Sequence, residues 1–173
     1  MENFTNETID TTQLPRYEEV PFTPLHPKYK TVVVLNLSIF SIVVVTGAAV
    51  YALFNFKILS PANWTFVSIG LLVLLGIYYF FALLGFKKKG FAFRNHDVLY
   101  RSGIIATSTM VIPYNRIQHV ALHEGLISRY FGLAKVEIFT AGGSASDIEI
   151  PGIDKAQAED IKQLLMGKIQ KQL

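Results

Sequence analysis

The sequence predicts a membrane-anchored α+β protein, in which a two-helix transmembrane hairpin precedes a small antiparallel β-barrel or sandwich that is capped by a C-terminal helix. Two observations carry this prediction. The stretch 31–86 contains a single charged side chain, Lys57, whereas the rest of the 173-residue chain has an ordinary density of charges. After this stretch come short alternating apolar runs, which are typical of strands, and then one run with helical spacing.

The composition excludes several classes of protein. The chain has no cysteine, which rules out disulfides, thiol chemistry, Fe–S clusters and Cys-ligated zinc. Its formal net charge of +3 is too small to indicate a nucleic-acid partner. The nearly uncharged central block excludes both a simple soluble globule and a disordered chain.

Residues 1–27 are predicted to form a flexible cytoplasmic tail. The segment is mainly acidic, and its first dozen residues are polar and rich in Thr and Asn. Its prolines lack a backbone donor and have a fixed φ, so they are expected to prevent regular structure. These prolines are Pro15, Pro21, Pro24 and Pro27.

Residues 28–88 are predicted to form the transmembrane hairpin. Two runs without Asp, Glu, Lys, Arg or His lie on either side of Lys57, and each exceeds the roughly 20 helical residues that cross a bilayer core. The spans are expected at about 31–56 and 62–86, with turn formers between them. Small residues are expected to bring the two helices together. They are Gly47, Ala48, Ala49, Ser68, Gly70 and Gly76.

The charges around the two spans predict how they are oriented in the membrane, and the absence of charges within them argues against a transporter or channel. Cytoplasmic flanks are enriched in Lys and Arg. Only Lys57 lies in the connecting loop, so both termini are expected in the cytoplasm. Ion paths usually contain ionisable groups, and none lies within the spans. Asn36 is expected to make a helix–helix hydrogen bond or to lie at the interface. The flanking cations are Lys28 and Lys30 on one side, and Lys87, Lys88, Lys89 and Arg94 on the other.

Residues 89–173 are predicted to form the cytoplasmic domain. Its strands have the even spacing of a small barrel or sandwich. They are expected around Phe91–Phe93, Val98–Arg101, Thr109–Ile112, Val120–Leu122, Ala134–Ile138 and Ile148–Ile150. One helical turn with Leu126, Tyr130 and Leu133 is expected to pack on the barrel, and Arg129 to point outward or to bond a carbonyl.

The chain is predicted to end in an amphipathic helix of about 17 residues, beginning with a capping box at Asp154 and Gln157. Its apolar stripe recurs at helical spacing. Burial of this stripe against the open end of the barrel is the simpler arrangement, with Leu164 or Leu165 in the core; a position on the membrane surface is the alternative. The stripe consists of Ile161, Leu164, Leu165 and Ile169.

No catalytic, cofactor or metal site is predicted, so the protein is expected not to be an enzyme. His119 and His123 are four residues apart, which on a strand is about 13 Å and too far for one metal ion. No GxSxG motif surrounds a serine. The remaining candidates bind lipid or a partner, because lysines beside an anionic membrane can gain about 1 kcal/mol each. They are Lys87, Lys88, Lys89, Arg94, Arg116 and Arg129.

Four stretches resemble the bacterial pleckstrin-homology-like (YdbS-like) membrane proteins. They are Leu25–Tyr29, Ile112–Val120, Gly125–Ala134 and Thr140–Gly143. The resemblance covers roughly residues 25–170. It implies two bent antiparallel sheets capped by a C-terminal helix, and a multi-pass protein of the bacterial inner or plasma membrane. It implies no enzymatic activity, cofactor or catalytic residue.

The resemblance also leaves several functions to compare. Eukaryotic pleckstrin-homology domains often bind inositol phosphates through a basic first hairpin, but the turn Asn95–Asp97 has no Lys or Arg. The first hypothesis is an interaction or assembly module that binds a membrane protein partner or further copies of itself. The second is a sensor of anionic membrane lipids, and the third is an unrecognised enzyme.

Overall fold

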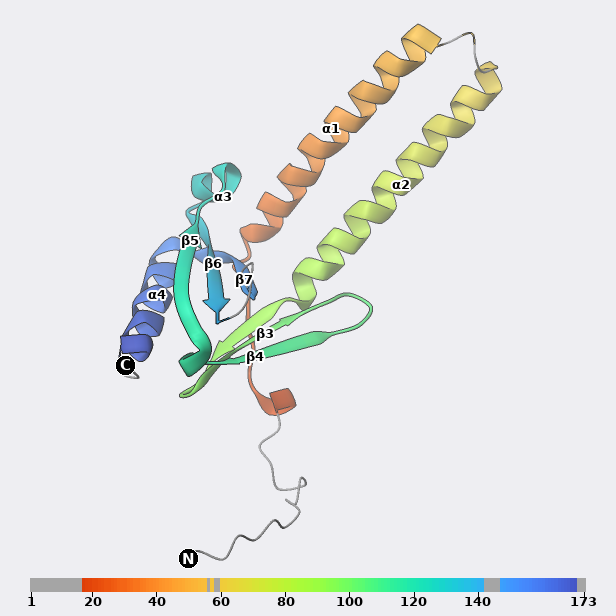
Figure 1. Ribbon diagram of the computed structural model, residues 1–173. Helices are drawn as coiled ribbons and strands as arrows, with labels where there is room; N and C mark the ends of the chain where they lie inside the picture. Colours follow the sequence, from red (N-terminus) through yellow and green to blue (C-terminus); the bar gives the residue numbers. More distant parts are fainter. Residues whose placement is uncertain (1–16, 56, 58–59, 142–146, 171–173) are drawn as a thin grey trace, which may run out of the picture.

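Two long helices project from a β-domain in the computed structural model, which describes residues 17–55, 57, 60–141 and 147–170. Figure 1 shows them side by side, joined at the end remote from the domain. Helix α1 covers Tyr29–Asn55 and α2 covers Pro61–Lys88, which confirms both predicted helical runs. Ser60 caps α2, because its Oγ accepts a hydrogen bond from the N–H of Asn63.

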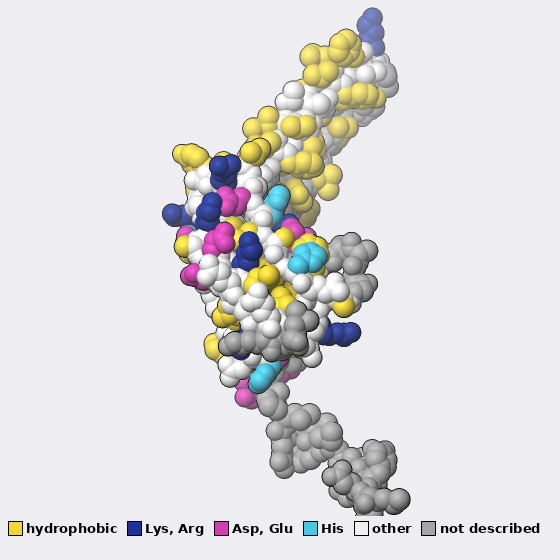
Figure 2. Space-filling model, turned by 60° about the vertical axis from the view of Figure 1, so that its left-hand side comes forward, with side chains coloured by type: hydrophobic (Ala, Val, Ile, Leu, Met, Phe, Trp, Pro, Cys, Tyr) yellow, Lys and Arg dark blue, Asp and Glu magenta, His cyan; other side chains and the backbone are white. Residues whose placement is uncertain are grey.

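Both helices are long and apolar enough to cross a membrane, with mean hydropathies of 2.3 and 2.4. Figure 2 shows hydrophobic side chains along the helical rod, while charged side chains lie on the domain and at the far tip of the hairpin. The structure therefore has two membrane-capable helices.

Aromatic and hydroxyl side chains join α1 to α2. The hydroxyls of Ser38 and Tyr79 are 3.0 Å apart, and the rings of Phe40 and Tyr78 have centroids 5.7 Å apart. Asn36 donates to Val32 O in its own helix rather than across the pair. The prediction that small residues mediate the packing is wrong at three glycines, since a Cβ would meet nothing within 4 Å at any of them. They are Gly47, Gly70 and Gly76.

The domain contains two open antiparallel sheets, so the predicted sandwich is confirmed rather than a closed barrel. The first sheet has the strand order β1-β2-β3-β4, and the second has the order β5-β6-β7. The strands are β1 (Thr23–Pro24), β2 (Gly90–Phe93), β3 (Asp97–Ser102), β4 (Ser108–Pro113), β5 (Ile117–His123), β6 (Leu133–Thr140) and β7 (Ile148–Asp154). Short helical turns are η2 (Tyr17–Glu19), η3 (Tyr114–Arg116) and α3 (Leu126–Tyr130).

The prediction of a flexible tail is wrong for residues 17–27; residues 1–16 lie outside the described part. Thr23 pairs with Phe91 and Pro24 with Gly90, and Leu25 is buried in the core. A proline is tolerated at the edge of a sheet because no further strand needs its missing N–H. The prolines therefore favour an extended edge strand that ties the start of α1 to the domain.

Helix α4 (Lys155–Gln170) caps the sheets, as predicted, although its buried face differs. Ala158, Ile161 and Leu165 are buried, whereas Leu164 is 47% exposed. The small Ala158 lies three residues before Ile161, so it shares the inward face, which is rotated away from Leu164. The carboxylate of Asp154 caps the helix by accepting from the N–H of Ala156.

The short helix α3 forms as predicted, but it does not bury Leu126 or Tyr130 on the sheets. Leu126 and Tyr130 are 93% and 86% exposed. Only Leu133, which begins β6 after the turn at Gly132, is in the core. The apolar residues one helical turn apart in α3 therefore lie on its solvent-exposed face.

Candidate functional site

The domain has two ends, and the strand directions decide which candidate residues meet at each. The helix-proximal end contains the β3–β4 turn (Gly103–Thr107), α3 and the junction of β7 with α4. The far end contains the β2–β3 turn and η3 (Figure 1). Of the predicted basic residues, Lys87, Lys88, Lys89 and Arg129 lie at the helix-proximal end, and Arg94 and Arg116 lie at the far end.

Arg94 has a structural role at the far end. Its guanidinium donates to both carboxylate oxygens of Asp97, at 2.6 and 2.5 Å. This hydrogen bonding raises the pKa of Arg94. The Tyr114 hydroxyl also donates to Arg94 O, at 2.5 Å. Arg94 therefore holds the β2–β3 turn, and the exposed Arg116 does not join the lysines of α2.

The helix-proximal end contains a groove of about 890 Å³ between the two membrane-capable helices and the β3–β4 turn. Its walls are mainly apolar and aromatic, which is typical of ligand sites. The lining from α1 includes Val33, Leu37 and Phe40, and the lining from α2 includes Tyr78, Phe81 and Ala82.

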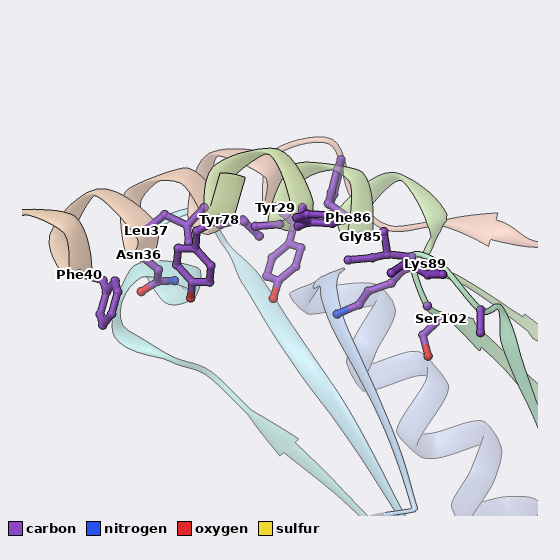
Figure 3. A pocket seen from close by; sticks show the side chains of 16 residues that line it. Tyr29, Asn36, Leu37, Phe40, Tyr78, Gly85, Phe86, Lys89 and Ser102 are labelled. Atoms are coloured by element: carbon purple, nitrogen blue, oxygen red, sulfur yellow. The ribbon is translucent and has the colours of Figure 1, made fainter. Parts of the chain in front are cut away.

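The polar groups of the groove project from several elements into the same space. Figure 3 shows the Lys89 ammonium and the Tyr29 hydroxyl directed toward the hollow, with Ser102 at its edge. Asn36 lies deeper along α1, beside Tyr78. No hydrogen bond or ion pair of the Lys89 ammonium is present within the described part of the chain. This cation is therefore available at the mouth of an apolar groove.

Lys88 holds the turn that lines the groove at its domain side. Its ammonium donates to Ile104 O at 2.8 Å, which fixes the β3–β4 turn against the end of α2. The Ile104 side chain packs beside the buried Gly85, where a Cβ would lie 3.2 Å from Ile104 Cδ1. Gly103 has φ +115°, and a Cβ there would collide with Ala106 O, so glycine is required to make this turn. Lys88 therefore has a positioning role.

A smaller hollow of about 340 Å³ adjoins the lysines on the outside of β1 and β2. It is lined by Lys87, Lys88 and Lys89 together with Arg101, whose guanidinium lies 4.1 Å from the centroid of the Phe22 ring. Arg101 is 12 positions beyond Lys89 and is not among the binding residues predicted from the sequence. The register Gly90↔Arg101 brings it beside the lysines. Strand pairing is the signal that could have found it.

Lys89 lines both hollows, so an apolar groove and a cluster of cations meet at one residue. Such a junction suits a molecule with an apolar chain and an anionic head. Stacking on Phe22 holds the Arg101 guanidinium in place while its edge remains free to bind oxygen atoms.

The two histidines that the sequence places four residues apart, His119 and His123, both lie on β5. His119 stacks on Phe139, with ring centroids 4.1 Å apart, and His123 is at the other end of β5. The described residues contain no group of three or more His, Asp or Glu side chains that could hold a metal ion.

The two sheets, the capping helix and the two apolar helices define a membrane protein with a pleckstrin-homology-like domain. The chain belongs to the family described as Bacterial PH domain, which matches residues 32–169. This match includes the two long helices as well as the domain, and it agrees with the resemblance found in the sequence. The family name points to a module without catalytic function.

One curated relative supports the same assignment. The chain is 30% identical over 67 residues to the UPF0699 transmembrane protein YdbS of Bacillus subtilis (strain 168). The similar stretch spans 39% of this chain and 40% of that protein, so most of the relative's length is not matched. No solved structure matches the chain.

Proposed function

We propose that the protein is a non-enzymatic membrane protein that binds an anionic phospholipid where its two spans join the domain. The acyl chain occupies the groove between α1 and α2, and the phosphate lies against Lys89, Lys87 and Arg101. The observation that carries the proposal is the meeting of the apolar groove and the basic hollow at Lys89.

Charge and geometry support an anionic headgroup at this position. The three lysines directly follow the last apolar turn of α2, which places them at the depth of lipid headgroups. The Lys88 ammonium donates a hydrogen bond to Ile104 O, whereas Lys87 and Lys89 make no ion pair within the residues that the structure describes. Each such cation near an anionic surface contributes about 1 kcal/mol.

The proposal includes an orientation in the membrane. Basic residues flank both spans on the domain side, and Lys57 alone lies in the connecting loop. We therefore place the domain and both termini in the cytoplasm of a bacterial cell, with the spans crossing the inner or plasma membrane twice. The groove then opens toward the inner leaflet.

Binding of lipid by charge variants tests this proposal. The full chain is reconstituted in nanodiscs of phosphatidylcholine with a minor fraction of phosphatidylglycerol, and the lipid retained after mild delipidation is identified by native mass spectrometry. Removing both free lysines with Lys87→Gln and Lys89→Gln is expected to weaken retention of phosphatidylglycerol by about 2 kcal/mol at low salt.

Arg116→Gln is the control for position, because it removes an exposed cation at the far end, although one charge and not two. It should leave the retained phosphatidylglycerol unchanged. Equal retention in the lysine variant and the wild type would contradict the proposal, as would an equal loss in the control.

A protein-interaction module is the second candidate, and one feature favours it. Strand β4 is at the edge of its sheet and carries the exposed apolar side chains of Met110 and Val111. It has no charged residue, and charges are a common protection against unwanted strand pairing. A strand from a membrane protein partner, or from a second copy, could add to this edge.

Crosslinking from β4 tests the second candidate. A photoreactive residue at Val111 should give one discrete protein adduct in membranes if the edge is an interface. The same residue at Gln163, on the exposed face of α4, is the control. Absence of a discrete adduct at Val111 would count against the interaction module.

A further inference from the structure

Three large apolar side chains of the domain are almost fully exposed, and they lie on two separate segments. Leu126 and Tyr130 belong to α3, and Ile105 belongs to the β3–β4 turn, where it is 92% exposed. Elsewhere in the described part of the domain, exposed large apolar residues keep about half of their surface covered. Exposed apolar side chains gathered at one end of a domain can mark a contact with a membrane or a protein.

The two segments lie on either side of the membrane-capable helices. Helix α3 contacts α1, and Ile104 of the turn packs at Gly85 of α2. Figure 1 shows both segments at the end of the domain from which the helices emerge. The exposed side chains therefore face the level at which α1 and α2 enter the lipid.

Local interactions hold both of the segments that carry these exposed apolar side chains in place. In α3, Leu126 and Tyr130 are one helical turn apart and share a face, and Gly132 ends the turn with φ +69°. The ion pair of Glu124 with Lys155, at 2.8 Å, ties the start of this segment to α4. The β3–β4 turn is fixed by the Lys88 hydrogen bond to Ile104 O.

We propose that α3 and the β3–β4 turn insert Leu126, Tyr130 and Ile105 into the leaflet that the domain faces. The domain then rests on the membrane at two points that flank the spans. Arg129 on α3 and Lys88 beside the turn lie at headgroup depth, and tyrosine is favoured at this boundary. This inference goes beyond the proposed lipid site, because it requires apolar contact and no anionic lipid.

Depth-dependent fluorescence quenching tests the insertion. The chain has one tryptophan, so Trp64→Phe gives a silent background to which Leu126→Trp or Ile105→Trp is added. Each full-length variant is placed in zwitterionic phosphatidylcholine nanodiscs, with and without bromine on the upper acyl carbons. His96→Trp, at the exposed far end, is the control.

Both new tryptophans should emit at shorter wavelength than the control and should be quenched severalfold more strongly by the brominated lipid. A failure of quenching at either position overturns the two-point contact. A short-wavelength emission without bromine quenching also overturns it, because a protein surface would then cover these side chains. Since the lipid is zwitterionic, neither result depends on an anionic headgroup. Ile105 also lines the groove, so Leu126→Trp is the position whose quenching is independent of a lipid in the proposed site.

Discussion

The ring of Tyr29, in the first turn of α1, lies directly against the backbone of Gly152 in β7. Gly152 has φ +65°, and a Cβ at this position would collide with the tyrosine ring. The N–H of His26 also donates to Gly152 O at 2.9 Å. This contact joins the beginning of the first span to the second sheet, so the helices and the domain are packed together and not merely linked.

Gly152→Ala is therefore expected to destabilise the protein by about 2–4 kcal/mol. Roughly 1–2 kcal/mol comes from the left-handed backbone and the rest from displacement of Tyr29. Thermal unfolding of the full chain in detergent measures the change. Gly167→Ala is the control: Gly167 is an exposed helical residue with open space around it, so alanine should stabilise α4 by about 0.5–1 kcal/mol. Equal effects of the two substitutions would contradict the packed junction.

Two adjacent leucines of α4 are expected to behave differently. Leu165 is fully buried and Leu164 is 47% exposed. Leu165→Ala should cost about 2–5 kcal/mol, because it removes core contacts and leaves a cavity. Leu164→Ala should lower the free energy of unfolding by well under half of that amount. Chemical unfolding of the full chain compares them; similar costs would show that α4 does not cap the sheets as described.

We expect the folded protein to lose stability in alkali because the phenol of Tyr100 is buried. Burial, followed by the neighbouring charges, raises its pKa to about 12 from 10.0. The unfolded chain therefore ionises first, so the stabilisation is complete below pH 10 and is lost as the pH rises toward 12. The shift corresponds to about 3 kcal/mol. Tyr100→Phe should reduce this slope in pH-dependent unfolding, whereas identical slopes would argue against a buried phenol.

The chain without cysteine offers a direct test of orientation. Single cysteines are introduced as Lys57→Cys in the connecting loop and Gln163→Cys on α4. In intact cells, a membrane-impermeant maleimide should label the loop position only. Labelling of both should follow after the cells are opened. Labelling of the α4 position alone in intact cells would reverse the proposed topology.

The sequence is informative where one local property decides the structure. The absence of charge predicts α1 and α2, and strand alternation followed by helical spacing predicts the order of the domain. The rotated face of α4 was missed because Leu164 is as apolar as Leu165, while the inward Ala158 gives a weak hydrophobic signal.

Long-range pairing limits the prediction of the N-terminal segment and of the site. Thr23 pairs with Phe91, far along the chain, and no local pattern around the prolines indicates this contact. For the same reason Arg101 was not predicted, because only strand register brings it beside the lysines. Arg94 was wrongly grouped with the lysines, because it is close to them in sequence but lies at the far end of the domain.

The central claim is that a lipid occupies the groove between the helices with its anionic head at Lys89. A photoreactive benzophenone residue replaces Phe81 in the groove, and in a separate variant Ala48 on an exposed face of α1. Both chains are irradiated in bacterial membranes, and the adduct masses are measured. We expect an adduct enriched in anionic phospholipid at position 81, and Lys87→Gln with Lys89→Gln should abolish the enrichment. At position 48 we expect the bulk lipid composition. The same bulk composition at both positions would contradict it.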